Sequence, residues 1–190
     1  AMMRSTENEL REIDAGKVDF TSRWDSAVAG AHALLIAEKD LADKNAPRAL
    51  RIYQGMLELM PEFAISLSDS AKELIGLSYR MNAVRAAGCY LAAPPESDVP
   101  AEEAAARRAA AAAKALEWFE FEVRRLGGNL RKKRWPGYAK RAFHYCRHSP
   151  DLAPFREPFI DDIPEADREA WRQLWAEIDQ LLADPPAATP

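Results

Sequence analysis

The sequence has few of the features that build β-sheets, disulfide-stabilised folds or membrane spans. It holds two cysteines in 190 residues, too few for a disulfide framework, so the expected location is a reducing cytoplasm. No apolar run approaches the roughly 20 residues that a membrane-spanning helix needs, and we expect no membrane partner. No alternating β-branched run and no Asn-Gly or Asp-Gly turn occurs. Strands are therefore not expected.

Helix-forming residues dominate instead. Alanine, the best helix former, is the most abundant residue, and the turns marked by proline or glycine are widely spaced. These signals predict an all-α fold with a short helix before Gly16 and longer helices over residues 21–44, 47–60, 70–91, 101–126, 137–148 and 164–184. In this prediction one helix ends before Pro61, and another ends at Gly127-Gly128.

The length suits one domain with its own core. We expect residues 1–15 to be an extension, either a short helix or disordered. Residues 16–184 form a single domain of helical-repeat type, and residues 185–190 form a frayed tail. Trp171 and Trp175 share one helix face and are expected in the core, whereas Gly88, which has no side chain, would let another helix approach closely.

Charge is distributed unevenly along the chain. Between Arg107 and Arg147 there are 12 Lys and Arg against 3 Asp and Glu, a net charge of +9, whereas the rest of the chain carries 14 against 27, a net charge of −13. One basic segment therefore lies in an acidic body. Two interpretations follow: the opposite charges face each other within the protein, or the segment binds an anionic partner.

Residues 33–61 resemble one tetratricopeptide repeat. The positions that carry the resemblance are Ala33, Ile36, Ala37 and Asp40 in the first helix, and Ala49, Tyr53, Met56 and Pro61 in the second. A second match has Val84, Ala87, Gly88 and Leu91 at first-helix spacing, with the alanine-rich helix as its partner. The resemblance implies tetratricopeptide-like antiparallel helical hairpins with a C-terminal helical cap.

The C-terminal third has a narrower resemblance. Residues 149–179, SPDLAPFREPFIDDIPEADREAWRQLWAEID, are similar to the tail of tetratricopeptide regions in certain bacterial proteins, many of which carry a eukaryotic-type serine/threonine kinase domain. No kinase motif occurs in this sequence: it has no glycine-rich loop, no His-Arg-Asp and no Asp-Phe-Gly. The resemblance implies an interaction or regulatory module of a signalling protein rather than a catalyst.

His144, Cys146 and His148 form the densest group of potentially reactive side chains. Two histidines four residues apart share one helix face, as in zinc-binding helices. Cys146 points away from that face, however, and no third ligand or adjacent glutamate is evident. We therefore interpret the group as the basic end of a helix, with a small helical metalloenzyme as the remaining alternative. In the turn that follows, Leu152 and Phe155 are expected to be buried.

The basic stretch RRLGGNLRKKRWPGYAKR, residues 124–141, contains the candidate contact residues. They are Arg131, Lys132, Lys133, Arg134, Trp135, Lys140 and Arg141. Arginine and lysine bind phosphates, and tryptophan can stack on a base. The alternative is a solvated loop that pairs with acidic residues at positions 161–167.

The sequence thus favours a non-catalytic module that binds a protein or peptide partner, which the sequence does not identify. An accessory nucleic-acid-binding protein that uses residues 124–141 is the alternative function. No cofactor, metal or catalytic residue is predicted.

Overall fold

The computed structural model describes residues 35–64, 69–95 and 99–183. The predicted extension, the start of the helix predicted from Thr21, and the C-terminal tail lie outside these residues. Residues 35–42 are helical. The later helices are α3 (Ala46–Ala64), α4 (Asp69–Ala92), α5 (Ala101–Arg131), α6 (Pro136–His148) and α7 (Glu165–Ala183), with two 3₁₀ helices, η1 (Pro150–Phe155) and η2 (Phe159–Asp162).

The predicted all-α class is confirmed, since the described part of the chain contains helices and turns but no strand. None of the described helices combines the length and the apolar character that crossing a bilayer requires. The arrangement of the helices as stacked tetratricopeptide hairpins remains an expectation from the resemblance.

Two predicted helix ends are wrong. Helix α3 continues through Pro61 to Ala64, although a proline lacks an N–H donor and its ring crowds the carbonyl oxygen four residues earlier in a helix. Packing of α3 against α4 offsets this cost. Helix α5 passes through Gly127-Gly128 and ends at Arg131. A glycine inside a helix costs only about 1 kcal/mol, and a Cβ on Gly127 would lie 3.0 Å from the Leu181 side chain of α7. Contact with α7 therefore favours glycine inside the helix.

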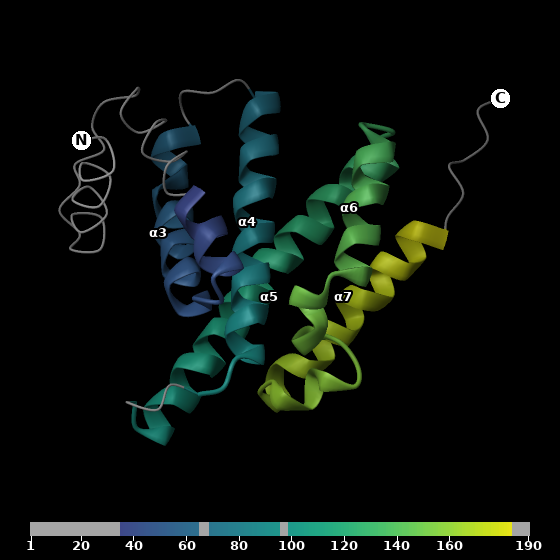
Figure 1. The fold of residues 1–190 in the computed structure, drawn as a ribbon. Coiled ribbons are helices and arrows are strands. Elements are labelled where there is room, and N and C mark those ends of the chain that lie inside the picture. Colours follow the sequence, from purple (N-terminus) through teal and green to yellow (C-terminus); the bar gives the residue numbers. More distant parts are fainter. Residues whose placement is uncertain (1–34, 65–68, 96–98, 184–190) are drawn as a thin grey trace, which may run out of the picture.

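Helix α5 is the centre of the arrangement (Figure 1). It packs against α4 on one side and against α6 and α7 on the other, and α4 in turn packs against α3. The chain reverses between α5 and α6, and again between α6 and α7. These reversals place the connection from α5 to α6 at one end of the molecule and the two 3₁₀ helices at the other.

An aromatic cluster joins the C-terminal elements to α5. The rings of Phe155 and Trp171 stack with centroids 4.3 Å apart, and Phe119 lies 5.2 Å from Trp171 and 4.9 Å from Trp175. All four side chains are buried, as predicted for the two tryptophans. Rings this large contribute much of the hydrophobic stabilisation of a small core.

Helix η1 inserts between the helices as the sequence predicts. Leu152 and Phe155 are fully buried, and η1 packs against α4 at Gly88. A Cβ on Gly88 would lie 1.8 Å from the backbone carbonyl oxygen of Asp151. The close approach predicted for this glycine is therefore present, although its partner is a 3₁₀ turn rather than a long helix.

Hydrogen bonds fix the turn after η1. The Trp175 Nε1–H donates to the Phe155 carbonyl oxygen at 2.7 Å. The Arg156 guanidinium donates to the carbonyl oxygens of Arg147 and Ser149 and lies 5.7 Å from the Trp175 ring. Arg156 thereby adds side-chain donors to two carbonyl oxygens at the end of α6, of which the Ser149 oxygen also accepts the Leu152 N–H at 3.2 Å.

Replacing Gly88 tests the close approach of α4 and η1. We expect Gly88→Ala to lower the free energy of unfolding by about 1–3 kcal/mol or more, because the new methyl group would overlap a backbone oxygen that cannot move independently. Gly55→Ala is the matched control: it adds a methyl group to α3 where no atom lies within 4 Å, so it should be neutral or stabilising. Urea unfolding measures both variants, and equal stability of the two would contradict the predicted clash.

A second pair of variants tests the buried turn. Phe155 is fully buried, whereas Phe159 four residues later is 55% exposed. Phe155→Ala should lower the free energy of unfolding by about 3–5 kcal/mol, because it removes the ring stacked on Trp171 and leaves a cavity. Phe159→Ala should change it by less than about 1 kcal/mol. Thermal unfolding followed by circular dichroism would show the difference, and comparable losses would contradict this account of the turn.

Candidate functional site

The predicted contact residues lie where α5 passes into α6. Arg131 is the last residue of α5, residues 132–135 form the connection, and Lys140 and Arg141 lie on α6. Lys140 is half-buried, whereas the other six side chains are exposed. The structure therefore brings all the predicted contact residues to one end of the molecule.

Local geometry determines how the connection is built. Its backbone is closed by hydrogen bonds from the Lys132 N–H to the Gly128 oxygen and from the Arg134 N–H to the Asn129 oxygen, at 3.0 and 2.8 Å. Lys133 and Trp135 have positive φ angles of 53° and 47°, which side chains with a Cβ adopt less readily than glycine. Pro136 then begins α6, a position that suits proline. The chain therefore reverses in four residues and leaves its basic side chains exposed.

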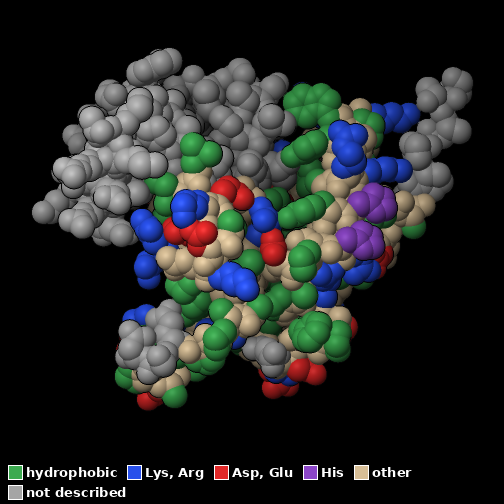
Figure 2. Space-filling view, viewed as in Figure 1, with side chains coloured by type: hydrophobic (Ala, Val, Ile, Leu, Met, Phe, Trp, Pro, Cys, Tyr) green, Lys and Arg blue, Asp and Glu red, His purple; other side chains and the backbone are tan. Residues whose placement is uncertain are grey.

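Helix α6 continues this basic surface. Arg141, His144, Tyr145 and His148 are exposed, and their three- and four-residue spacing places them on one side of the helix. Ala139, Phe143 and Cys146 are buried on the opposite side. Figure 2 shows Lys and Arg side chains on both sides of the two described histidines over α6. The exposed surface, called here the cationic face, consists of Arg131, Lys132, Lys133, Arg134, Trp135, Arg141, His144, Tyr145 and His148.

No acidic residue interrupts the cationic face in the sequence. Residues 123–150 contain nine Lys and Arg and no Asp or Glu. Arg131, Lys132, Lys133 and Arg141 form no ion pair with any described residue. Arg134 has an interaction of its own. Most of the charge on this face therefore remains open to a partner.

Asp161, an acid of the 161–167 segment, and the acids Glu157 and Asp179 nearby have partners other than the basic loop. Asp161 lies 3.6 Å from Arg168, and the neighbouring Glu157 lies 2.9 Å from Arg172. Asp179 pairs with Arg147, on the side of α6 that faces α7. The arginines of α7 itself thus take up Asp161 and Glu157. The interpretation in which the basic loop pairs with the acids at 161–167 receives no support from these contacts.

His144, Cys146 and His148 do not converge on one site. The two histidines are exposed on the cationic face, whereas Cys146 is buried against the core. Burial raises the pKa of the Cys146 thiol to about 12, so at neutral pH it is a protonated apolar residue rather than a nucleophile. Within the described part of the chain, no group of three or more His, Cys, Asp or Glu residues is placed to hold a metal ion.

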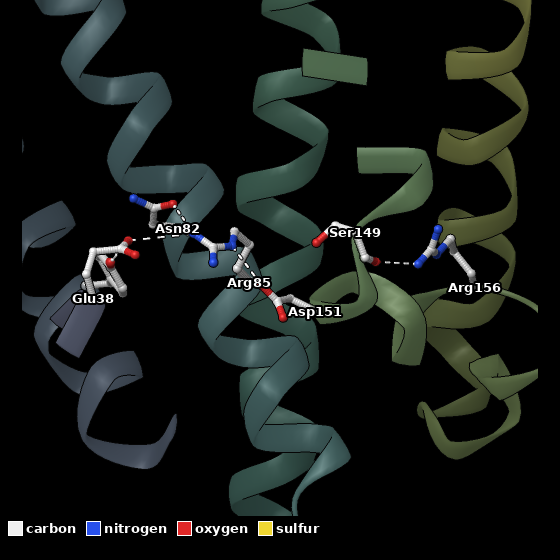
Figure 3. Close-up of polar contacts among 7 residues, drawn as sticks. Glu38, Asn82, Arg85, Ser149, Asp151 and Arg156 are labelled. Atoms are coloured by element: carbon white, nitrogen blue, oxygen red, sulfur yellow. Dashed lines mark hydrogen bonds and ion pairs between the residues drawn. The ribbon is translucent and has the colours of Figure 1, made fainter. Parts of the chain in front are cut away.

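A polar network lies beside the cationic face (Figure 3). The Arg85 guanidinium of α4 donates to Asp151 at 2.9 Å and to Asn82 at 3.1 Å, and it lies 3.7 Å from Glu38. It also lies 6.0 Å from the Tyr145 ring. Burial lowers the pKa of Arg85, but the carboxylates and hydrogen bonds around it outweigh that effect and raise it above its usual value. Arg85 thus connects the helix at 35–42, α4, η1 and α6.

Glu122 is a buried carboxylate between α4, α5 and α6. Its Oε2 accepts hydrogen bonds from Arg125 at 3.0 and 3.2 Å, and its Oε1 lies 3.8 Å from Arg80 and has no hydrogen-bond partner. Tyr138 and Cys146 of α6 also face it, and the presence of its charge favours their neutral forms. Burial raises the pKa of Glu122 to about 7, although both arginines act to lower it.

The raised pKa of Glu122 predicts a stability that depends on pH. Its ordinary pKa is 4.5, so between that value and about pH 7 the folded protein holds a proton that the unfolded chain has released. The free energy of unfolding should therefore fall as the pH rises through this range, by on the order of 3 kcal/mol. Urea unfolding at a series of pH values from 4.5 to 8 would measure the slope.

Glu122→Gln should remove this part of the pH dependence, because its amide carries no charge at any of these pH values. Glu120→Gln is the matched control: Glu120 lies on the solvent side of α5 beside Arg124, so this variant should keep the wild-type slope. Parallel slopes for wild type and Glu122→Gln would contradict the prediction.

Sequence reasoning found six of the nine residues of the cationic face and missed the other three. It interpreted His144 and His148 as the basic end of a helix, with metal binding as the alternative, and did not single out Tyr145, although their spacing from Arg141 places all four on one side of α6. Arg85 had no comparable signal, because its partners Glu38 and Asp151 are distant in the sequence. The burial of Glu122 had no signal in the sequence either, since the stretch EWFEFEVRR contains three glutamates and does not indicate which of them is buried.

No model of a known protein family, no curated protein and no solved structure matches this chain. Its function is therefore inferred from its own residues.

Proposed function

We propose that this chain is a non-catalytic helical module that binds an anionic partner through the cationic face. The observation that carries the proposal is the stretch of 28 residues, 123–150, which contains no acid and folds with Arg131, Lys132, Lys133, Arg134 and Arg141 exposed at the end of α5, along the connection and on α6. A surface of one charge sign attracts oppositely charged partners and accelerates their association. The rest of the chain has a net negative charge, which restricts such binding to this face.

The buried surroundings support a binding role rather than catalysis. Cys146 is a protonated core thiol, and the Glu122 carboxylate is enclosed by protein groups. General acid–base or nucleophilic catalysis requires such groups to reach a substrate. The resemblance to tetratricopeptide regions, which implies an interaction or regulatory module, agrees with this proposal.

Neutralising the face tests the proposal. The probe is fluorescein-labelled heparin, a polyanion without aromatic bases, titrated with protein at several salt concentrations. A triple variant, Arg131→Gln, Lys132→Gln and Lys133→Gln, should weaken the Kd about 3- to 100-fold, because each exposed charge pair contributes up to about 1 kcal/mol. Binding by the wild type should also weaken as salt is added.

The matched control changes the net charge equally at other positions. Lys39→Gln, Arg51→Gln and Lys114→Gln replace three exposed cations outside the face, and we expect this triple variant to bind heparin with nearly the wild-type Kd. Equal weakening by the two triple variants would show that only the net charge matters. Absence of wild-type binding at low salt would exclude the proposed function.

A further inference from the structure

We infer that the anionic partner of the cationic face is a single-stranded nucleic acid, whose bases stack on Trp135 and Tyr145 while its phosphates contact the surrounding Arg and Lys side chains. The inference rests on the proposed function and names the chemical class of its partner.

The first step concerns which apolar side chains remain exposed. In the described part of the chain the large hydrophobic residues left exposed are Leu35, Phe121, Trp135, Tyr145 and Phe159. Two of the four aromatic ones, Trp135 and Tyr145, lie on the cationic face and are 45% and 47% exposed. Positive charges alone can bind either class of polyanion, a carboxylate-bearing peptide or a nucleic acid, whereas the bases of an unpaired strand can in addition stack on exposed aromatic rings. The exposed rings therefore favour a polyanion that carries bases.

The second step concerns how Trp135 is held. Its backbone is left-handed, and its carbonyl oxygen accepts hydrogen bonds from the N–H groups of Tyr138 and Ala139 at 3.0 and 3.2 Å. Its backbone position is thus fixed by the first turn of α6. Pro136 follows it directly, and three exposed cations, Lys132, Lys133 and Arg134, precede it. A partly exposed ring on a fixed backbone loses little conformational freedom when a base stacks on it.

The third step concerns Tyr145. It lies on the exposed side of α6, opposite Phe143 and Cys146. The Arg85 guanidinium lies 6.0 Å from the ring centroid and is itself held by Asp151 at 2.9 Å. Arg85 therefore supports the ring from α4, while Asp151 and Glu38 balance its charge. Arg141, exposed on the same side of α6 as Tyr145, provides the phosphate contact beside the ring.

The fourth step concerns spacing. The ten-residue separation of the two rings along α6 corresponds to about 15 Å at a rise of about 1.5 Å per residue. Between them along the helix axis lie Arg141 and His144, which share the exposed side of α6 with Tyr145. A single strand following α6 thus meets a ring, a cation and a second ring in order. The bases of a duplex are already stacked on one another, so their faces are not available to these rings.

Binding to oligonucleotides tests the inference. The probes are fluorescein-labelled mixed-sequence 12-nucleotide single strands of RNA and of DNA, the corresponding DNA duplex, and a poly-glutamate peptide of similar charge. We expect both single strands to bind more tightly than the duplex and the peptide. The logarithm of affinity should fall with the logarithm of salt concentration, as counterion release requires.

Variants that preserve charge separate stacking from electrostatics. Trp135→Leu and Tyr145→Leu should each weaken the single-strand Kd about 5- to 150-fold, a larger loss than that of heparin affinity, because heparin has no base to stack on a ring. Trp135→Phe and Tyr145→Phe, which keep a ring, should retain most of the affinity. Phe159→Leu is the control, since it alters an exposed ring outside the cationic face. Circular dichroism shows whether each variant is folded.

The outcomes distinguish this inference from the proposed function. If the peptide or the duplex binds as tightly as the single strands, or if the leucine variants bind them like wild type, the inference is overturned, while heparin binding would still support the proposed function. Loss of binding to every polyanion would exclude both. The inference is supported if Trp135→Leu and Tyr145→Leu bind the single strands more weakly than wild type, while the phenylalanine variants and Phe159→Leu do not.

Discussion

The close contact between η1 and α4 is the constraint on which the C-terminal half of this protein depends. The backbone of Asp151 lies against Gly88, where no side chain larger than hydrogen fits. That approach carries Leu152 and Phe155 into the core and stacks Phe155 on Trp171. Since η1 directly follows α6 and leads to α7, its position determines where both helices pack against α5. A six-residue turn therefore organises elements much longer than itself.

The same packing separates charge from apolar surface on α6. One side of the helix contributes Phe143 and Cys146 to the core. The opposite side is left to Arg141, His144, Tyr145 and His148, which continue the basic connection from α5. The arginines of α7 take up acids such as Asp161 and Glu157. Within residues 123–150, Arg124, Arg125 and Arg147 pair with acids of the same chain. The charges of Arg131, Lys132, Lys133 and Arg141 stay on the cationic face without an ion pair to any described residue.

Buried and half-buried ionic groups lie directly behind this surface. Arg85 connects Glu38 and Asp151 and supports the Tyr145 ring, and Glu122 is enclosed by Arg80, Arg125 and groups of α6. A buried charge is costly unless it is paired, and a pair that leaves one oxygen without a donor is only partly compensated. Glu122 therefore takes up a proton readily, whereas Arg85, with several partners, remains charged. These groups connect the stability of the core to the elements that present the cationic face.

The sequence by itself determined the helical class, most helix positions and the burial of Leu152, Phe155, Trp171 and Trp175. Helix propensity, proline positions and apolar spacing act over a few residues, so they can be recognised in a linear chain. It also predicted the basic connection, because consecutive like charges are exposed in most packings. Only the tertiary structure decided that α5 continues through its glycine pair, that Arg85 lies beside Tyr145, and that Glu122 rather than Glu120 is buried. Each of these outcomes depends on contacts between residues far apart in the sequence, with Leu181 against Gly127, Arg85 beside Tyr145 and Arg80 beside Glu122. Such contacts form only when the helices pack, and local residue preferences do not specify that packing.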